Sequence, residues 1–310
     1  MLKTTEFLSL LDEQEIDMQK LLVSLDEQIF EAVLSGKPIK DIEDLRILKT
    51  TVETKIRASH SFVPVPWSTG TDEGIVAMVA AADAGKINLA DYWAVGDTRT
   101  VHLSAMEATG VGESHTEQDV ELVLMHAGEY KLNSAVESGR DTCSFVVGMK
   151  DCLNEAGYMN SVDTNSGSWD ACARRDWCNS VFKDAIPTSL LPIFKQFKTI
   201  TAETYNGTTL KTSVDWFALP AEREIFGTMY KYNDDGFVCD TEATSADMFQ
   251  FDWYKTAANR TKKHNGSAYA WWERSPYYGN SNGFCLVYND GDAYGSLASR
   301  ALGLSVFGCV

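Results

Sequence analysis

The sequence lacks any apolar run of the length that crosses a bilayer, which is about 18 residues or more. Its first residues, MLKTTEFLSLLDEQEID, also lack the basic start, the unbroken apolar stretch and the small-residue cleavage site of a signal peptide. We therefore expect no membrane insertion, and synthesis in the cytoplasm without a signal peptide. Another export route stays open, so this expectation does not decide where the protein acts.

Basic residues are scarce. The chain has 44 Asp and Glu against 27 Lys and Arg, and its formal net charge is −17. Affinity for phosphate comes from clustered Lys and Arg, so we expect no nucleic-acid partner. The same imbalance disfavours binding to anionic membranes. With 44% hydrophobic residues, the chain can still bury a substantial core.

Catalytic and metal-binding motifs are also missing. The sequence contains no HExxH pair, no GxSxG turn, no Walker A loop and no GxGxxG motif. Residues 233–236 and 289–292 have the composition of calcium loops but not the DxDxDG spacing, so we interpret both as turns. We therefore expect no catalytic residues, no metal and no cofactor.

The cysteines are odd in number, so they cannot all pair within one chain. In a reducing cytoplasm we expect most of them to be small buried apolar residues. Cys172 and Cys178 lie six apart, which is not the CxxC spacing of zinc sites. The seven are Cys143, Cys152, Cys172, Cys178, Cys239, Cys285 and Cys309.

The N-terminal region predicts two helices, at 2–35 and 39–58, separated by the helix-breaking sequence Gly36-Lys37-Pro38. The first helix has an apolar seam with a seven-residue repeat. The seam consists of Leu8, Leu22 and Ile29 with Leu11, Met18 and Leu25. We predict that residues 1–60 form a helical hairpin or coiled coil that oligomerises the chain or attaches it to a larger particle. The alternative is that the seam packs on the rest of the chain.

The remaining sequence mixes short helices and strands, which predicts the α+β class. We expect a linker and a small mixed α/β region at 61–130 and a ligand-binding domain at 131–310. Helices are predicted at 72–84, with Asp72 as N-cap and Gly85 after the last turn, and at 168–184. Strands are predicted at 92–95, 100–103, 121–126, 144–147, 214–219, 268–272, 284–288 and 304–310.

The last 40 residues have an unusual composition. Trp271-Trp272 and Arg274-Ser275-Pro276 precede a stretch rich in Tyr, Asn, Ser, Gly and Asp. Binding loops use this mixture, but so do ordinary turns. None of the 34 residues from 277 to 310 is Lys, Glu, Gln, Met or Trp, although these types make up 60 of the 310 residues. Turn-rich segments also tend to lack these types.

The motif at 271–276, the scattered polar positions after it and the ending Phe307-Gly308-Cys309-Val310 resemble the variable proteins of diversity-generating retroelements. The phage major tropism determinant is the founding example of that family. Residues 91–106 and 145–161 show a looser resemblance, which in all covers 90–310. The resemblance implies a C-type-lectin-like fold, shared with formylglycine-generating enzymes. It also implies error-prone copying of AAY codons, which cannot produce the five missing residue types.

From the resemblance we expect a non-enzymatic receptor-binding protein of a phage, prophage or bacterium, located on a virion tail tip or alternatively on the bacterial surface. Its expected partners are a host-surface protein or glycan, further copies of itself in a trimer, and other tail or virion proteins. Trp271, Trp272 and Glu273 are expected to be fixed scaffold. The predicted ligand-binding residues are Tyr277, Tyr278, Asn280, Asn282, Leu286, Tyr288, Asp290, Asp292, Tyr294, Ser296, Leu297, Arg300 and Leu302.

Two alternatives stay open. A formylglycine-generating-type oxidase would need a reactive cysteine pair, for which Cys285 and Cys309 are the candidates. Among nearby residues only Arg300 offers a cation that could stabilise a thiolate. The chain could also be an inert structural virion component. The EPN, QPD and WND motifs of calcium-dependent lectins are absent, so calcium-dependent sugar binding is not implied.

Overall fold

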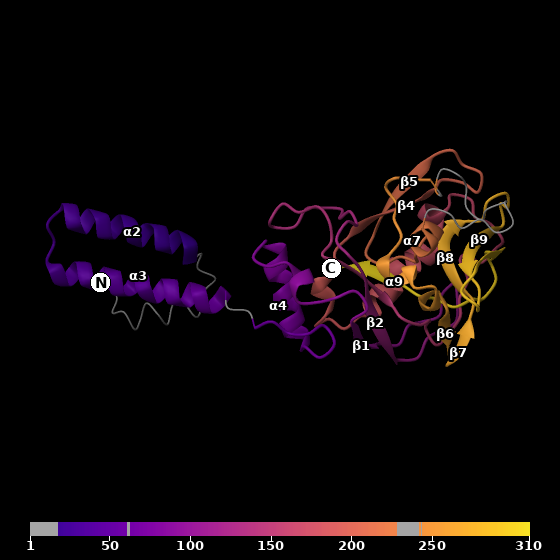
Figure 1. The fold of residues 1–310 in the computed structure, drawn as a ribbon, viewed down its shortest axis with the longest axis horizontal. Coiled ribbons are helices and arrows are strands. Elements are labelled where there is room, and N and C mark those ends of the chain that lie inside the picture. The colour runs from indigo at the N-terminus through magenta and orange to yellow at the C-terminus, as the bar shows by residue number, and fades with distance from the viewer. Residues whose placement is uncertain (1–17, 61–62, 228–241, 243) are drawn as a thin grey trace. The chain divides into compact units, whose positions relative to one another are not determined.

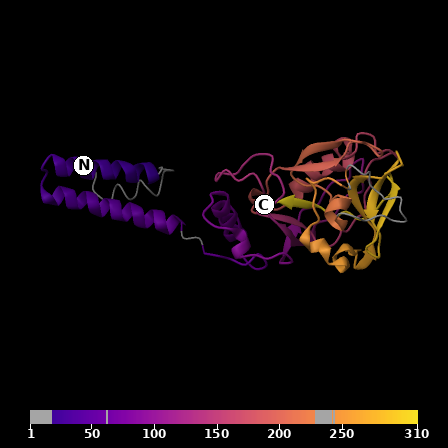
Figure 2. The same ribbon diagram turned by 45° about the horizontal axis from the view of Figure 1, so that its top comes forward.

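The computed structural model describes residues 18–60, 63–227, 242 and 244–310. These residues divide into two compact units, with the boundary between Val63 and Pro64. Each unit is described by itself (Figures 1 and 2). None of the helices in the described ranges combines the length and the apolar character that a membrane crossing requires.

The first unit is a helical hairpin of α2 (Met18–Leu34) and α3 (Ile39–His60) (Figure 1). Gly36 makes the turn between them with φ of 63°, a conformation that suits glycine. Leu25 and Ala32, seven residues apart, are buried. The hairpin predicted for this region is confirmed where the structure describes it. The seam residues Leu8 and Leu11 lie outside the described residues.

The main sheet of the second unit is antiparallel and has the strand order β1-β2-β3-β11. Its strands are β1 (Thr98–Leu103), β2 (Gln118–Ala127), β3 (Phe145–Met149) and β11 (Phe307–Cys309). Because β2 pairs with β3, the segments before and after residue 130 share one sheet. The predicted boundary at 130 is therefore wrong, and residues 64–310 form a single unit.

A second antiparallel sheet has the order β10-β9-β8, so β9 is its central strand. It comprises β8 (Trp271–Pro276), β9 (Gly283–Val287) and β10 (Ala293–Leu297), and β8 and β9 lie side by side in Figure 1. Two antiparallel pairs complete the strands. They are β4 (Phe197–Ala202) with β5 (Leu210–Asp215), and β6 (Lys262–His264) with β7 (Ser267–Tyr269).

The helices of this unit are short. The longest in the described part is α4 (Asp72–Asp83), capped by Thr71 rather than by Asp72, because the Thr71 hydroxyl accepts the Gly74 N–H at 3.2 Å. Gly85 follows with φ of 71°, as predicted. The predicted helix at 168–184 is confirmed as η2 (Trp169–Ala171), α5 (Ala173–Trp177), η3 (Cys178–Phe182) and α6 (Lys183–Ala185). The others are η1 (Leu89–Asp91), η4 (Leu191–Ile193), α7 (Glu222–Phe226), α9 (Asp252–Lys255) and η5 (Ala257–Arg260).

The α+β class is confirmed, with antiparallel sheets and few helices. Three predicted strands differ. Residues 92–95 are not a strand, and the Trp93 indole instead donates to the Val65 carbonyl at 2.9 Å. The strand predicted at 214–219 ends at Asp215, where Asn179 Oδ1 accepts the Trp216 N–H. The strand predicted at 268–272 is divided between β7 and β8.

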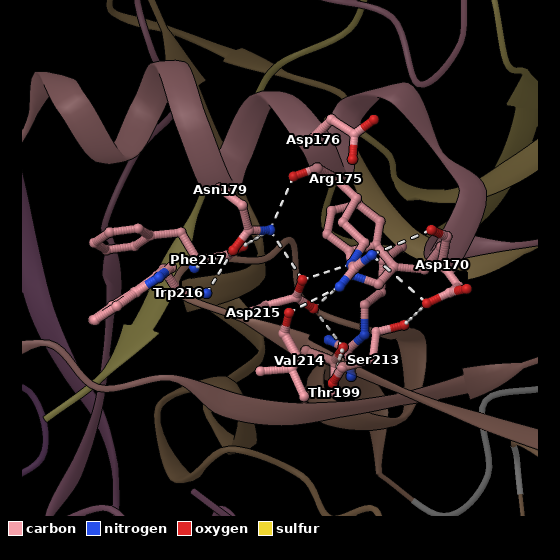
Figure 3. A network of polar contacts seen from close by, with 12 residues as sticks. Asp170, Arg175, Asp176, Asn179, Thr199, Ser213, Val214, Asp215, Trp216 and Phe217 are labelled. Atoms are coloured by element: carbon pink, nitrogen blue, oxygen red, sulfur yellow. Dashed lines mark hydrogen bonds and ion pairs between the residues drawn. The ribbon is translucent and has the colours of Figure 1, made fainter. Parts of the chain in front are cut away.

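Asp215 at the end of β5 is fully buried and joins the helical segment 169–185 to the β4–β5 pair (Figure 3). One carboxylate oxygen accepts bonds from Arg175 Nε at 2.6 Å and Asn179 Nδ2 at 2.9 Å. The other accepts from Trp169 Nε1 at 2.9 Å and Thr199 Oγ1 at 2.6 Å. The charge is thus paired with Arg175 and every lone pair faces a donor, which is what a buried carboxylate requires.

Candidate functional site

The scaffold of the C-terminal region is β8, in which every residue is buried. The indole of Trp271 donates to the Arg260 carbonyl at 2.9 Å, and the indole of Trp272 donates to the Gly157 carbonyl at 2.9 Å. Large aromatic side chains whose N–H groups are satisfied are stable core elements. The core location expected for Trp271 and Trp272 is confirmed by their burial, and Glu273, expected to be fixed scaffold, is buried as well.

Arg274 fastens β8 to α7. Its two Nη atoms donate to the two carboxylate oxygens of Glu224 at 2.6 and 2.5 Å, in a buried bidentate pair. The Tyr130 hydroxyl and the Ala221 N–H also donate to Glu224, at 2.6 and 2.9 Å. Burial acts to lower the pKa of Arg274, but the charge of Glu224 outweighs it and raises the pKa.

Burial changes across the β8–β9–β10 sheet. Trp272, Leu286 and Tyr294 form one row, because Leu286 of β9 pairs with Trp272 on one side and with Tyr294 on the other. Their exposed fractions are 0%, 2% and 49%. Paired residues point to the same face of a sheet. One face of this sheet is therefore covered over β8 and β9 and opens to solvent at β10.

The predicted ligand-binding residues follow this gradient, and eight of them are exposed. We call these eight the C-terminal surface: Tyr278, Asn282, Tyr288, Asp290, Asp292, Tyr294, Leu297 and Arg300. Tyr277, Asn280 and Ser296 are half-buried. The structure places them beside the surface.

Leu286 and Leu302 do not belong to this set. Leu286 is 2% exposed in the central strand, and Leu302 is 4% exposed with its N–H bonded to the Gly157 carbonyl. A ligand on the surface cannot contact side chains that the fold covers, so their assignment to the ligand-binding set is wrong.

The C-terminal surface has two parts at opposite ends of β9. Tyr288 and Tyr294 lie together at one end, with ring centroids 5.8 Å apart. Leu297 and Asn282 lie at the other end, since Leu297 pairs with Gly283 and the Ala298 N–H bonds to the Asn282 carbonyl. At about 3.3 Å per residue along the strand, the two parts are separated by roughly 15 Å.

A distant segment braces the turns of this surface. The Asn165 side-chain amide donates to the carbonyls of Asn280 and Gly283, both at 2.7 Å. Asp163 accepts bonds from the Ser299 N–H at 3.1 Å and the Ser299 hydroxyl at 2.6 Å. Sequence analysis missed both braces, because two polar residues in a loop give no sign of which main chain they will bond.

The turn at 289–292 is confirmed as a turn. The Tyr288 N–H bonds to the Asp292 carbonyl at 2.7 Å, and Gly291 has φ of 93°. The Asp290 carboxylate accepts the Asp292 N–H at 3.1 Å, which closes an Asx turn. Residues 233–236, for which a turn was also predicted, lie outside the described residues.

Sequence analysis also missed a buried group of side chains that α7, β8 and β9 bring together. Glu222, Glu273 and Cys285 each offer one atom, and these three atoms lie within 4.8 Å of one another. We call these residues the acid–thiol cluster. Burial and the charge of Glu242 raise the pKa of Glu222 to about 8. Burial and the neighbouring carboxylates raise the pKa of Glu273 and of the Cys285 thiol.

The other cysteines largely match expectation. Cys143, Cys172, Cys178 and Cys309 are buried like Cys285, whereas Cys152 is half-buried. Cys239 lies outside the described residues. Cys285 belongs to β9 and Cys309 to β11, which are strands of different sheets.

The second unit is thus a mixed α+β domain with an exposed, tyrosine-rich surface on β10 and on the turns beside the buried strands β8 and β9. A family model described as a domain of unknown function, DUF6273, matches residues 145–305, which is more than half of the chain. The chain belongs to this family. No curated protein and no solved structure matches it.

Proposed function

We propose that the protein is a non-enzymatic binding protein, and that the C-terminal surface contacts a protein or glycan on a host cell. The proposal includes a C-type-lectin-like fold for residues 131–310 and a diversity-generating origin for the surface. The antiparallel sheets and few helices of the domain are compatible with that fold.

The proposal rests on the positions of the large apolar side chains that are exposed to solvent. Within the described part of 64–310, seven such side chains are exposed: Tyr92, Val162, Val214, Tyr278, Tyr288, Tyr294 and Leu297. The last four fall within 20 residues of one another in sequence. Tyrosine provides large amphipathic contact area at low cost in conformational entropy, so a gathering of this kind favours recognition of a ligand.

The helical hairpin is proposed to assemble the chain into a trimer or attach it to a virion tail or a cell surface. Large apolar side chains are exposed on its described part: Phe30, Val33, Leu34, Ile39 and Ile47. Burying them against further copies would supply the hydrophobic gain that association needs. An oligomer would also multiply a weak single-site affinity into avidity.

Sequencing the 3′ end of the gene across a natural population tests the diversity-generating origin. We expect substitutions to concentrate at the eight codons of the C-terminal surface. Leu286 and Leu302 serve as internal controls, because they lie among the variable codons but are buried. Substitution at Leu286 as frequent as at Tyr288, or a segment as constant as the rest of the gene, would contradict the proposal.

A pair of variants tests the division between scaffold and surface. Trp272→Ala should lower the free energy of unfolding by about 3–5 kcal/mol, because it opens a cavity in the core. Tyr288→Ala should change it by less than about 0.5 kcal/mol and should alter only binding. Urea unfolding of the two variants provides the measurement. Equal losses of stability would show that Tyr288 is part of the scaffold.

The two alternatives predict different results. A formylglycine-generating-type oxidase needs a reactive thiol, whereas burial raises the pKa of both Cys285 and Cys309 and so disfavours their thiolates. Rapid alkylation of either thiol in the folded chain would support the oxidase. An inert structural component predicts that several simultaneous substitutions on the C-terminal surface leave host attachment unchanged.

A further inference from the structure

The two carboxylates of the acid–thiol cluster are buried without a compensating positive charge of their own. Glu222 and Glu273 are 2% and 0% exposed, and no N–H or O–H group of the described residues donates to their four carboxylate oxygens. Glu222 has a contact with the Cys285 thiol, which is only a weak donor. An ionised carboxylate that loses its hydration without a donor or a cation is strongly destabilising. Something must therefore neutralise this pair.

The positively charged side chain next to the cluster is already paired with another carboxylate. Arg274 follows Glu273 in β8, but both of its Nη atoms bond to Glu224. Glu242, which is also fully buried, adds a further negative charge and contributes to the raised pKa of Glu222. Three carboxyl groups thus share this part of the core with Arg274, whose charge acts on Glu273 and Glu242 but whose hydrogen bonds go to Glu224.

We propose that the acid–thiol cluster is a structural binding site for a thiophilic divalent metal ion, of which zinc is the best chemical match. Zinc binds cysteine sulfur at about 2.3 Å and carboxylate oxygen at about 2.0–2.2 Å, with tetrahedral geometry. Tetrahedral ligand atoms at these lengths lie roughly 3.3–3.7 Å apart. The observed limit of 4.8 Å requires only small rotations of the side chains. Calcium and magnesium prefer oxygen ligands alone, so the thiol disfavours them.

Glu242 lies next to the cluster, outside the three residues whose ligand atoms are within 4.8 Å of one another, and is the candidate for a fourth ligand. The Ser275 hydroxyl bonds to Glu242 Oε1 and accepts the Glu222 N–H at 3.0 Å. The Ala202 N–H fixes the other oxygen of Glu242 at 2.8 Å. Ser275 thereby holds Glu242 beside Glu222, in the orienting role that residues around a metal site commonly have. With Glu242 as a fourth protein ligand no coordination position would stay open, which is typical of structural zinc sites rather than catalytic ones.

The proposed ion would join α7, β8 and β9 at one point, and so stiffen the two strands next to the turns and to β10 that carry the C-terminal surface. This role does not depend on what that surface binds. It departs from the expectation that no cysteine is a metal ligand, because that expectation considered only spacing within the sequence. The three residues come from separate segments, and the fold alone brings them together.

Cobalt binding to the full chain provides the test. The chain is stripped of metal with a chelator, its fold is checked by circular dichroism, and Co²⁺ is added. We expect one equivalent to bind, with a thiolate-to-cobalt absorption band and the visible bands of tetrahedral cobalt. Zn²⁺ should displace the cobalt and raise the Tm of the stripped chain. Glu273→Gln should weaken Co²⁺ binding at least about tenfold.

Cys285→Ser should abolish the thiolate-to-cobalt band, while Cys178→Ser should retain it. Cys178 is an equally buried cysteine whose charged neighbours are Arg174 and Asp215, outside the cluster. The wild-type spectrum reports thiolate coordination even if a variant fails to fold. The proposal is overturned if the folded, stripped wild-type chain takes up no Co²⁺, or if the band persists in Cys285→Ser. Bound protons would then be what neutralises Glu222 and Glu273.

Discussion

Asp215 and the pair Glu222 and Glu273 are buried to a similar degree in the same domain, but their surroundings differ. Asp215 accepts bonds from four donors, including the guanidinium of Arg175 (Figure 3). Among the described residues, no N–H or O–H group donates to the two glutamates, and Glu222 has only the weak thiol donor of Cys285. A buried carboxylate with its partners in place is a strong cross-link, whereas one without partners destabilises the fold until a proton or a metal ion neutralises it.

Burial alone therefore does not decide whether a charged side chain stabilises or destabilises the fold. The same loss of hydration is offset at Asp215 by donors from two separate segments, the helical segment 169–185 and β4. In the acid–thiol cluster the described chain offers only the weak thiol donor of Cys285 and the charge of Arg274, which is bonded to Glu224. Three predictions follow for the chain in the presence of a chelator, where no metal compensates the cluster.

The largest expected effect is at Asp215. Asp215→Ala should lower the free energy of unfolding by about 3–5 kcal/mol, because it leaves Arg175 and three buried or half-buried donors without their acceptor. Urea unfolding followed by circular dichroism measures this loss. Asp290→Ala, in the exposed turn of the C-terminal surface, is the control and should change stability little. A small effect at Asp215 would mean that water replaces the lost carboxylate.

Glu273→Leu should have the opposite effect on stability. Replacing an uncompensated buried carboxyl group by an apolar side chain of similar size should raise the free energy of unfolding by about 1–4 kcal/mol. Glu224→Leu is the matched control, because Glu224 is equally buried but is paired with Arg274. The control should be destabilised. If both variants lose stability to the same extent, Glu273 has partners that make it resemble Asp215.

The third prediction is a dependence of stability on pH. The pKa of Glu222 is raised by burial to about 8, so between about pH 4.5 and 8 the folded chain holds a proton that the unfolded chain has lost. The stabilisation is therefore complete below the unfolded pKa and is lost as the pH rises towards 8, at no more than about 1.4 kcal/mol per pH unit for one group. Unfolding at pH 5.5 and 8.0 measures the slope, which Glu222→Gln should reduce. An unchanged slope in that variant would assign the dependence to other groups.

Much of the fold could be predicted from residue patterns. Periodicity predicted the helical hairpin, the strands that became β1, β2, β3 and β9, and the helical segment at 169–185. The tryptophans of β8 were expected to be scaffold from the family resemblance of their motif, and they are buried. The order of the strands in the sheets could not be predicted from the sequence, and this order determines which residues are buried. Leu286 and Tyr288 lie in the same polar-rich segment, but Leu286 sits in a central strand and Tyr288 in the turn that follows.

The candidate sites also divide into one that could be predicted from the sequence and others that could not. Eight residues of the C-terminal surface were predicted from composition and are exposed, and their role in binding stays a prediction. The acid–thiol cluster and the braces from Asp163 and Asn165 could not be predicted. Each depends on contacts between segments that are far apart in sequence. A single sequence without its relatives carries no record of such contacts.

The brace at Asn165 has a consequence for the thermodynamics of recognition. Its amide bonds to the main-chain carbonyls of Asn280 and Gly283, and not to side chains. Substitutions at 280–282 therefore leave the acceptors in place, and the loop keeps its shape while its chemistry changes. A loop held in this way loses little further conformational freedom when it meets a partner. Each new set of side chains would start with a similar entropic cost of binding, and affinity would then depend on the contacts alone.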